Sequence, residues 1–67
     1  MSAEDLYIKK IEALTRGIRL GTKKPSDVAT EVASAFNKLK ASNIGMYDDL
    51  LNKYNNVVSD FNKKNTK

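Results

Sequence analysis

The sequence predicts an all-α protein that folds as a small three-helix bundle, whose core self-association could complete, and three observations support this prediction. Three helix-length segments each place their apolar residues on one side, at the three- and four-residue spacing of an α-helix. Two short joints containing glycine, proline or asparagine separate the segments. The chain has 67 residues, enough for one small domain. We expect helices over roughly 3–20, 25–41 and 45–62, in one domain over 1–62 followed by a disordered basic tail over 63–67.

The first segment has start and stop signals as well as an apolar stripe. Ser2 is a suitable N-cap, because its hydroxyl can accept a hydrogen bond from a free amide of the first turn. Glu4 and Asp5 place negative charge where the helix dipole favours it. Gly21 is where we expect the helix to end, since glycine readily adopts the left-handed conformation. The stripe consists of Ala3, Tyr7, Ile11, Leu14 and Ile18.

The second segment opens on Pro25, which lacks an amide donor and therefore suits the first turn of a helix. Its stripe consists of Val28, Val32, Phe36 and Leu39, with Ala35 beside it. Ala29 and Ala33 lie four residues apart along one edge, so a neighbouring helix could approach closely there. We expect this helix to pack tightly between the other two.

The third segment follows the second joint, residues 42–45, and has the clearest pattern. Its apolar residues are Tyr47, Leu50, Leu51, Tyr54, Val57, Val58 and Phe61. A stripe this broad is typical of a helix that faces the core of a bundle. Short joints favour antiparallel neighbours, which supports the bundle. The alternative is an extended helical hairpin whose third helix docks only on a second chain.

The composition argues against catalysis. The chain has no cysteine and no histidine, which removes disulfides, cysteine nucleophiles, the usual zinc ligand sets and the commonest general acid–base group. Ser34 and Lys38 are four residues apart, but an exposed Ser–Lys pair on a helix is common. Asp48 and Asp49 point about 100° apart on a helix, and no calcium-loop spacing follows them. We expect no catalytic residue, metal ion, cofactor or small-molecule substrate.

The hydropathy pattern predicts no membrane association. The longest apolar run near the N-terminus is Leu6-Tyr7-Ile8, whereas a membrane-spanning helix needs about 20 apolar residues. No secretory signal is visible. We therefore expect a cytoplasmic protein, or an intravirion one if a phage encodes it. Tiny stand-alone helical proteins are frequent among phage and mobile-element accessory products.

The distribution of charge gives one candidate function, a small basic nucleic-acid-binding accessory protein. The formal net charge is +4, and the positive excess lies in the first joint and the tail rather than on a helix face. Such lysines and arginines would bind phosphates in a salt-sensitive way. The third segment is net acidic and the tyrosines lie on apolar stripes, which argues against this alternative. The candidate nucleic-acid contacts are Arg16, Arg19, Lys23, Lys24, Lys63 and Lys64.

Protein interaction is the favoured function. Five apolar residues lie off the main stripes, where a minimal bundle has no obvious room for them: Leu6, Ile8, Leu20, Ile44 and Met46. Leu6 and Ile8 flank the first stripe on opposite sides, and a helix with such a wide apolar arc usually has more than one neighbour. We expect a non-enzymatic interaction module, acting as an adaptor, an inhibitor or an assembly component. Its partner would be a larger protein or a second copy of the chain.

Overall fold

The computed structural model describes residues 2–65, which form three α-helices and no strand. Helix α1 spans Ala3–Leu20, α2 spans Pro25–Ser42 and α3 spans Ile44–Asn65. Every helix contacts the other two, so the three form a compact bundle within one chain. The predicted three-helix bundle is confirmed, and the alternative of a hairpin with an undocked third helix is wrong.

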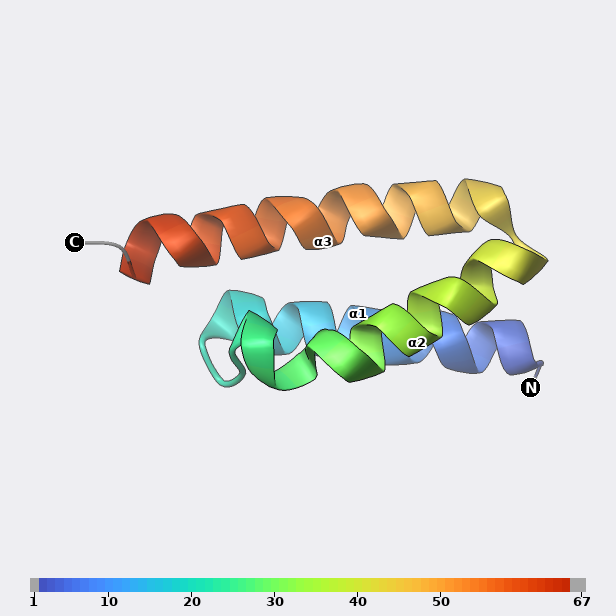
Figure 1. The fold of residues 1–67 in the computed structure, drawn as a ribbon, viewed down its shortest axis with the longest axis horizontal. Coiled ribbons are helices and arrows are strands. Elements are labelled where there is room, and N and C mark those ends of the chain that lie inside the picture. Colours follow the sequence, from blue (N-terminus) through green and yellow to red (C-terminus); the bar gives the residue numbers. More distant parts are fainter. Residues whose placement is uncertain (1, 66–67) are drawn as a thin grey trace.

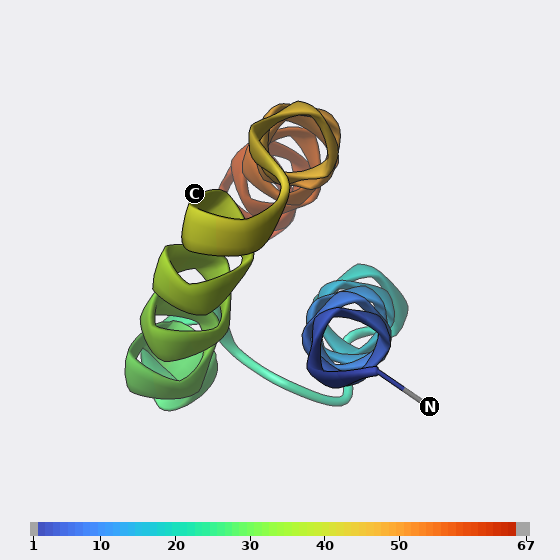
Figure 2. The ribbon, with the colours of Figure 1, turned by 90° about the vertical axis from the view of Figure 1, so that its right-hand side faces the viewer.

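The bundle is elongated and has two distinct ends. It measures about 41 × 19 × 17 Å, and α1 and α3 run in the same direction along it, with α2 antiparallel to both (Figure 1). Seen end-on, the helices occupy the corners of a triangle (Figure 2). The C-terminal ends of α1 and α3 therefore lie beside the first joint, residues 21–24, at what we call the first-joint end. Their N-terminal ends lie beside Asn43, at the second-joint end.

The predicted signals at the ends of α1 are confirmed. The Asp5 amide donates a hydrogen bond to Ser2 Oγ at 3.2 Å, so Ser2 caps the helix. Gly21 adopts a left-handed conformation with φ of 83°. Its amide donates to the Ile18 carbonyl at 3.1 Å, and the next amide, that of Thr22, donates to the Gly17 carbonyl at 2.9 Å. Free carbonyls of the last turn are thereby satisfied.

Helix α3 is longer than predicted at both ends. It begins at Ile44, where the Met46 amide donates to Asn43 Oδ1 at 3.1 Å. It continues to Asn65, so the expectation of a disordered tail from residue 63 is wrong for Lys63 and Lys64. Both lysines lie in the last turn, where the helix dipole favours positive charge. Residues 66–67 of the predicted tail lie outside the described residues.

The core is made mainly by α1 and α2, with α3 packed across them. The buried apolar side chains are Ile11, Leu14, Ile18, Val28, Val32, Ala35, Phe36, Leu39 and Leu50. Most of the α3 stripe is half-buried against this cluster. The ring of Phe36 meets the edges of Tyr47 and Tyr54, each with a centroid separation of 5.7 Å. These contacts join α2 to α3.

The expected position of α2 between the other two helices is wrong. In the triangular arrangement each helix touches both others, so none lies between. Ala29 and Ala33 are exposed to solvent. The stripe that contains Val28 and Val32 faces the core instead, and the alanine edge lies about 100° around the helix from it. The small residues therefore mark an open side of α2.

Truncation of a core side chain should remove much of the stability of this small bundle. Ile11→Ala should lower the free energy of unfolding by about 2–5 kcal/mol, because Ile11 is fully buried. The matched variant Leu6→Ala, on the same helix but 54% exposed, should change it by less than about 1 kcal/mol. Urea unfolding followed by far-ultraviolet circular dichroism measures both. Equal losses would contradict the packing of α1.

Two glycine substitutions should have opposite effects. Gly21→Ala should destabilise the protein by about 1–2 kcal/mol, because its φ of 83° is strained for a residue with a Cβ. Gly45→Ala should stabilise it by up to about 1 kcal/mol through helix propensity. The nearest atom to the added Cβ is Asn43 Oδ1 at 3.6 Å, an ordinary contact. Thermal melts compare the two variants, and a shift of Tm in the same direction for both would contradict these assignments.

Candidate functional site

The described residues include surface hollows and exposed charged and apolar side chains that could bind a ligand. Within residues 2–65, no three side chains of the His, Cys, Asp and Glu types are placed to hold a metal ion. No helix in that range has the length and apolar character needed to cross a bilayer. Ser34, Lys38, Asp48 and Asp49 are all exposed. Capacity for binding therefore lies in surface hollows and in exposed charged and apolar side chains.

All six candidate nucleic-acid contacts lie at the first-joint end. Arg16 and Arg19 occupy the last part of α1, and Lys23 and Lys24 belong to the first joint. Lys63 and Lys64 lie in the last turn of α3. Arg16 and Lys64, the first and last of these residues, are 48 positions apart in sequence, and the parallel course of α1 and α3 brings them to one end. All six are exposed.

A hollow of about 380 Å³, the first-joint hollow, opens among these basic residues. It exists because α3 extends beyond the end of α1 over the first joint (Figure 1). Its lining consists of Ile18, Arg19, Leu20, Gly21, Lys24, Val57, Asp60, Phe61 and Lys64. The lining thus combines four apolar side chains with three cations and one anion.

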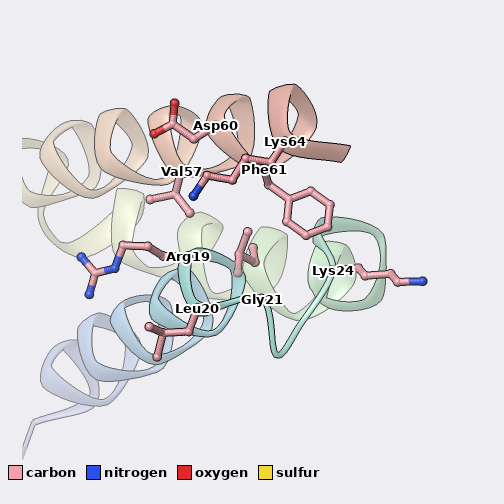
Figure 3. Close-up of a pocket in the computed structure, with 9 residues that line it drawn as sticks. Arg19, Leu20, Gly21, Lys24, Val57, Asp60, Phe61 and Lys64 are labelled. Atoms are coloured by element: carbon pink, nitrogen blue, oxygen red, sulfur yellow. The ribbon is translucent and has the colours of Figure 1, made fainter. Parts of the chain in front are cut away.

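Ile18, Val57 and Phe61 form the apolar floor of the hollow, the charged side chains lie around it, and the Leu20 side chain points away from α3. Figure 3 shows the Phe61 ring reaching from α3 toward the first joint, with Val57 one turn before it. Arg19 and Lys24 extend outward in different directions. The Asp60 carboxylate points to the side of α3 away from α1. A ligand entering the hollow would therefore meet an apolar floor and a mainly positive rim.

Leu20 adds exposed apolar surface at this hollow. It is 67% exposed and lies on the side of α1 away from α3 (Figure 3). A single exposed leucine is ordinary on a protein surface. Leu20 differs from an isolated one because it shares the lining of a hollow with Ile18 and Phe61. A ligand that extends beyond the hollow around α1 would also contact Leu20.

The five predicted interface residues do not form one surface. Leu6 and Ile44 are 54% and 55% exposed and lie at the second-joint end, opposite Leu20. Ile8 and Met46 are half-buried and pack against the core. The premise that the bundle has no room for these last two is therefore wrong. A role in protein contact remains a prediction for all five.

The second-joint end is mainly acidic. Glu4 and Asp5 lie in the first turn of α1, and Asp48 and Asp49 lie near the start of α3. Ser42 Oγ donates to Glu4 Oε1 at 3.1 Å, which fixes this carboxylate at the end of α2. Lys40 also lies near this end, with its ammonium 5.5 Å from the Tyr47 ring centroid. Charge is consequently polarised along the long axis of the bundle.

A second hollow, which the sequence did not predict, lies between α2 and α3. Its volume is about 370 Å³. It is lined without charged residues by Ala29, Val32, Ala33, Phe36, Asn37, Tyr47, Leu51, Tyr54 and Asn55. Ala29 and Ala33, whose spacing predicts a close helix contact, instead leave this side of α2 open. Burial raises the pKa of the Tyr54 phenol above its usual value of 10.0.

No protein-family model, curated protein or solved structure matches this chain. A functional proposal therefore rests on the geometry and charge of the bundle itself.

The raised pKa of Tyr54 should affect how the free energy of unfolding changes with pH under alkaline conditions. The folded protein holds the phenol proton more tightly than the unfolded chain, whose pKa is 10.0. This contribution is fully present below pH about 10 and is lost as the pH rises through the folded pKa. Tyr54→Phe should therefore reduce the fall in unfolding free energy above pH 10, and Tyr7→Phe, which retains Tyr54, should not. Urea unfolding at pH 8 to 11 measures this, and identical slopes in all three proteins would contradict the burial of Tyr54.

Proposed function

We propose that this protein is a non-enzymatic protein-binding module whose first-joint end binds an acidic segment of a partner through an exposed apolar side chain. The observation that carries the proposal is the first-joint hollow, which combines an apolar floor with a cationic rim. An adaptor, an inhibitor and an assembly component would all use such a contact. We place it in the cytoplasm, or inside a virion if a phage encodes it.

The apolar floor would provide most of the affinity. Burial of one aliphatic or aromatic side chain from water contributes about 1.5–3 kcal/mol. The hollow has space for such a side chain beside Val57 and Phe61. Because α3 extends over the first joint, two elements of the bundle would hold the inserted group.

The cationic rim would orient the partner and exclude basic competitors. Arg19, Lys24 and Lys64 are exposed at the hollow. Exposed ion pairs contribute only about 0–1 kcal/mol each, since water and salt screen them. Their larger effect is on the rate and specificity of association. Carboxylates on both sides of an apolar residue would meet this rim best.

Nucleic-acid binding is the second candidate function, and a specific observation favours it. The fold collects all six predicted phosphate contacts at one end of the molecule. Two features favour a protein partner instead. The floor between these cations is apolar, and Tyr47 and Tyr54 pack their rings on Phe36 rather than offering an open stacking surface.

A labelled peptide with one leucine flanked by glutamates tests the proposal. The full-length protein should bind it, and Leu20→Ser should weaken binding about tenfold, a loss of about 1.4 kcal/mol. The matched variant Leu6→Ser removes an equally exposed side chain at the opposite end and should bind as the wild type does. Replacement of the peptide leucine by serine should abolish detectable binding. Fluorescence anisotropy measures all four affinities.

A duplex oligonucleotide in the same assay separates the two candidate functions. Phosphate binding by six cations should lose several powers of ten in affinity between 50 and 200 mM salt and should not respond to Leu20→Ser. Peptide binding through the hollow should fall only modestly with salt. Binding of the oligonucleotide alone, with no binding of the peptide, would replace the proposed function with the second candidate.

A further inference from the structure

We infer that the partner of the first-joint end is a second copy of this chain, which presents its acidic second-joint end. The inference rests on the proposed function, because it names the protein that fills the first-joint hollow. The contact is head-to-tail, so each molecule contacts one neighbour through its first-joint end and another through its second-joint end. Two independent features of the structure support it: complementary charge, and exposed apolar side chains at both ends.

The charges of the two ends are complementary. Arg19, Lys24 and Lys64 surround the first-joint hollow, and three more bases lie at the same end. The opposite end presents four carboxylates from α1 and α3, those of Glu4, Asp5, Asp48 and Asp49, against the two bases Lys38 and Lys40 near the end of α2, so its net charge is negative. A copy placed head-to-tail would bring these carboxylates to the cationic rim. Contact between like ends would instead place bases against bases or acids against acids, which is unfavourable.

Exposed large apolar side chains, like the charges, lie at both ends of the bundle. Among residues 2–65, large apolar side chains are strongly exposed at Leu6, Leu20 and Ile44. Leu20 lies at the first-joint end, and Leu6 and Ile44 lie at the second-joint end. The helix dipole accounts for acids at the starts of helices and bases at their ends. It does not account for apolar side chains beside both groups of charges, whereas a shared interface does.

The acidic end offers the apolar side chain that the hollow requires. Ile44 is the first residue of α3 and stands 55% exposed at the tip of the bundle. Leu6 is one turn into α1, close behind Glu4 and Asp5. Leu6 directly follows Asp5, and Asp48 comes one turn after Ile44, so each side chain has a carboxylate nearby on its own helix, which is the chemistry proposed for the partner segment. Ile44 is the better placed of the two to enter a hollow, because it precedes the body of its helix.

The size of the ends predicts a weak association. The cross-section of the bundle is about 19 × 17 Å. An end-on contact therefore buries on the order of 300 Å² on each copy, well below the roughly 800 Å² per partner of a stable complex. Because the two contact surfaces differ, each added copy exposes a fresh end, and the association continues beyond a dimer. The expected product is a population of short linear chains that grows with concentration.

Sedimentation equilibrium of the full-length protein from about 10 µM to 1 mM tests the inference. The weight-average mass of the wild type should rise steadily and pass that of a dimer. Leu20→Ser and the double variant Leu6→Ser/Ile44→Ser should each weaken the association about tenfold, a loss of about 1.4 kcal/mol per contact. Ala33→Ser, an exposed substitution on the side of α2, should associate as the wild type does. Circular dichroism confirms equal folding of all variants.

Mixing the two end variants gives a second readout. Leu20→Ser retains an intact acidic end, and Leu6→Ser/Ile44→Ser retains an intact basic end. At concentrations where neither variant associates alone, an equimolar mixture should therefore form one wild-type contact per pair and stop at a heterodimer. Chains longer than a dimer in the mixture at those concentrations would overturn the head-to-tail arrangement, as would a wild type whose mass reaches a plateau at the dimer.

The result also separates this inference from the proposed function. A wild type that stays monomeric at 1 mM but still binds the acidic peptide would overturn self-association and leave the binding site in place. A monomer that binds no acidic peptide would overturn both. Association that is unaffected by Leu20→Ser would place the contact elsewhere and overturn the inference alone.

Discussion

Burial of Ile11, Ile18 and Leu39 among the three helices is the interaction on which the rest of this structure depends. These are the largest side chains with almost no exposed surface. A domain of this size buries only about 60% of the surface that its unfolded chain exposes, so the burial of its core leaves only a small net stability. No disulfide supplements it, because the chain has no cysteine. The pairing of α1 with α2 therefore sets the frame on which α3 lies, and the positions of both ends follow from that frame.

The fold could be predicted because the helix-end signals, the short joints and the apolar stripes all favour the same three-helix bundle. Ser2 and Gly21 mark the ends of α1, and the helix has those bounds. The apolar stripes identified the core, including Ile11, Leu39 and Leu50. The predictions that are wrong rest on sequence patterns that are compatible with two different packing arrangements. Ala29 and Ala33 are suited either to a close helix contact or to an open face, and only the direction of the neighbouring stripe decides between them.

The candidate site could be predicted only in part, because it depends on how distant segments meet. The sequence identified the six bases but gave no reason to place Lys64 beside Arg19. That neighbourhood follows from the parallel course of α1 and α3, together with the extra length of α3. The apolar stripe predicts a core position for Phe61, and its ring is half-buried against the core but also lines the hollow. Ile8 and Met46 were misread because a helix in a triangular bundle has two neighbours and buries a wider arc than one stripe.

The charges at the two ends have two physical roles, and this decides which substitutions are informative. Glu4 and Asp5 in the first turn of α1, and the bases in the last turns of α1 and α3, stabilise these helices through their dipoles by about 0.3–1 kcal/mol each. Reversal of such a charge would change stability and binding together, so its effect on binding would have no single cause. Leu20 and Ile44 make no such contribution, because they are apolar and more than half exposed. If replacement of Leu20 or Ile44 by serine weakens association, the loss therefore comes from the contact itself. The charged residues first suggested the site, but substitutions of these apolar residues are the ones that test its function.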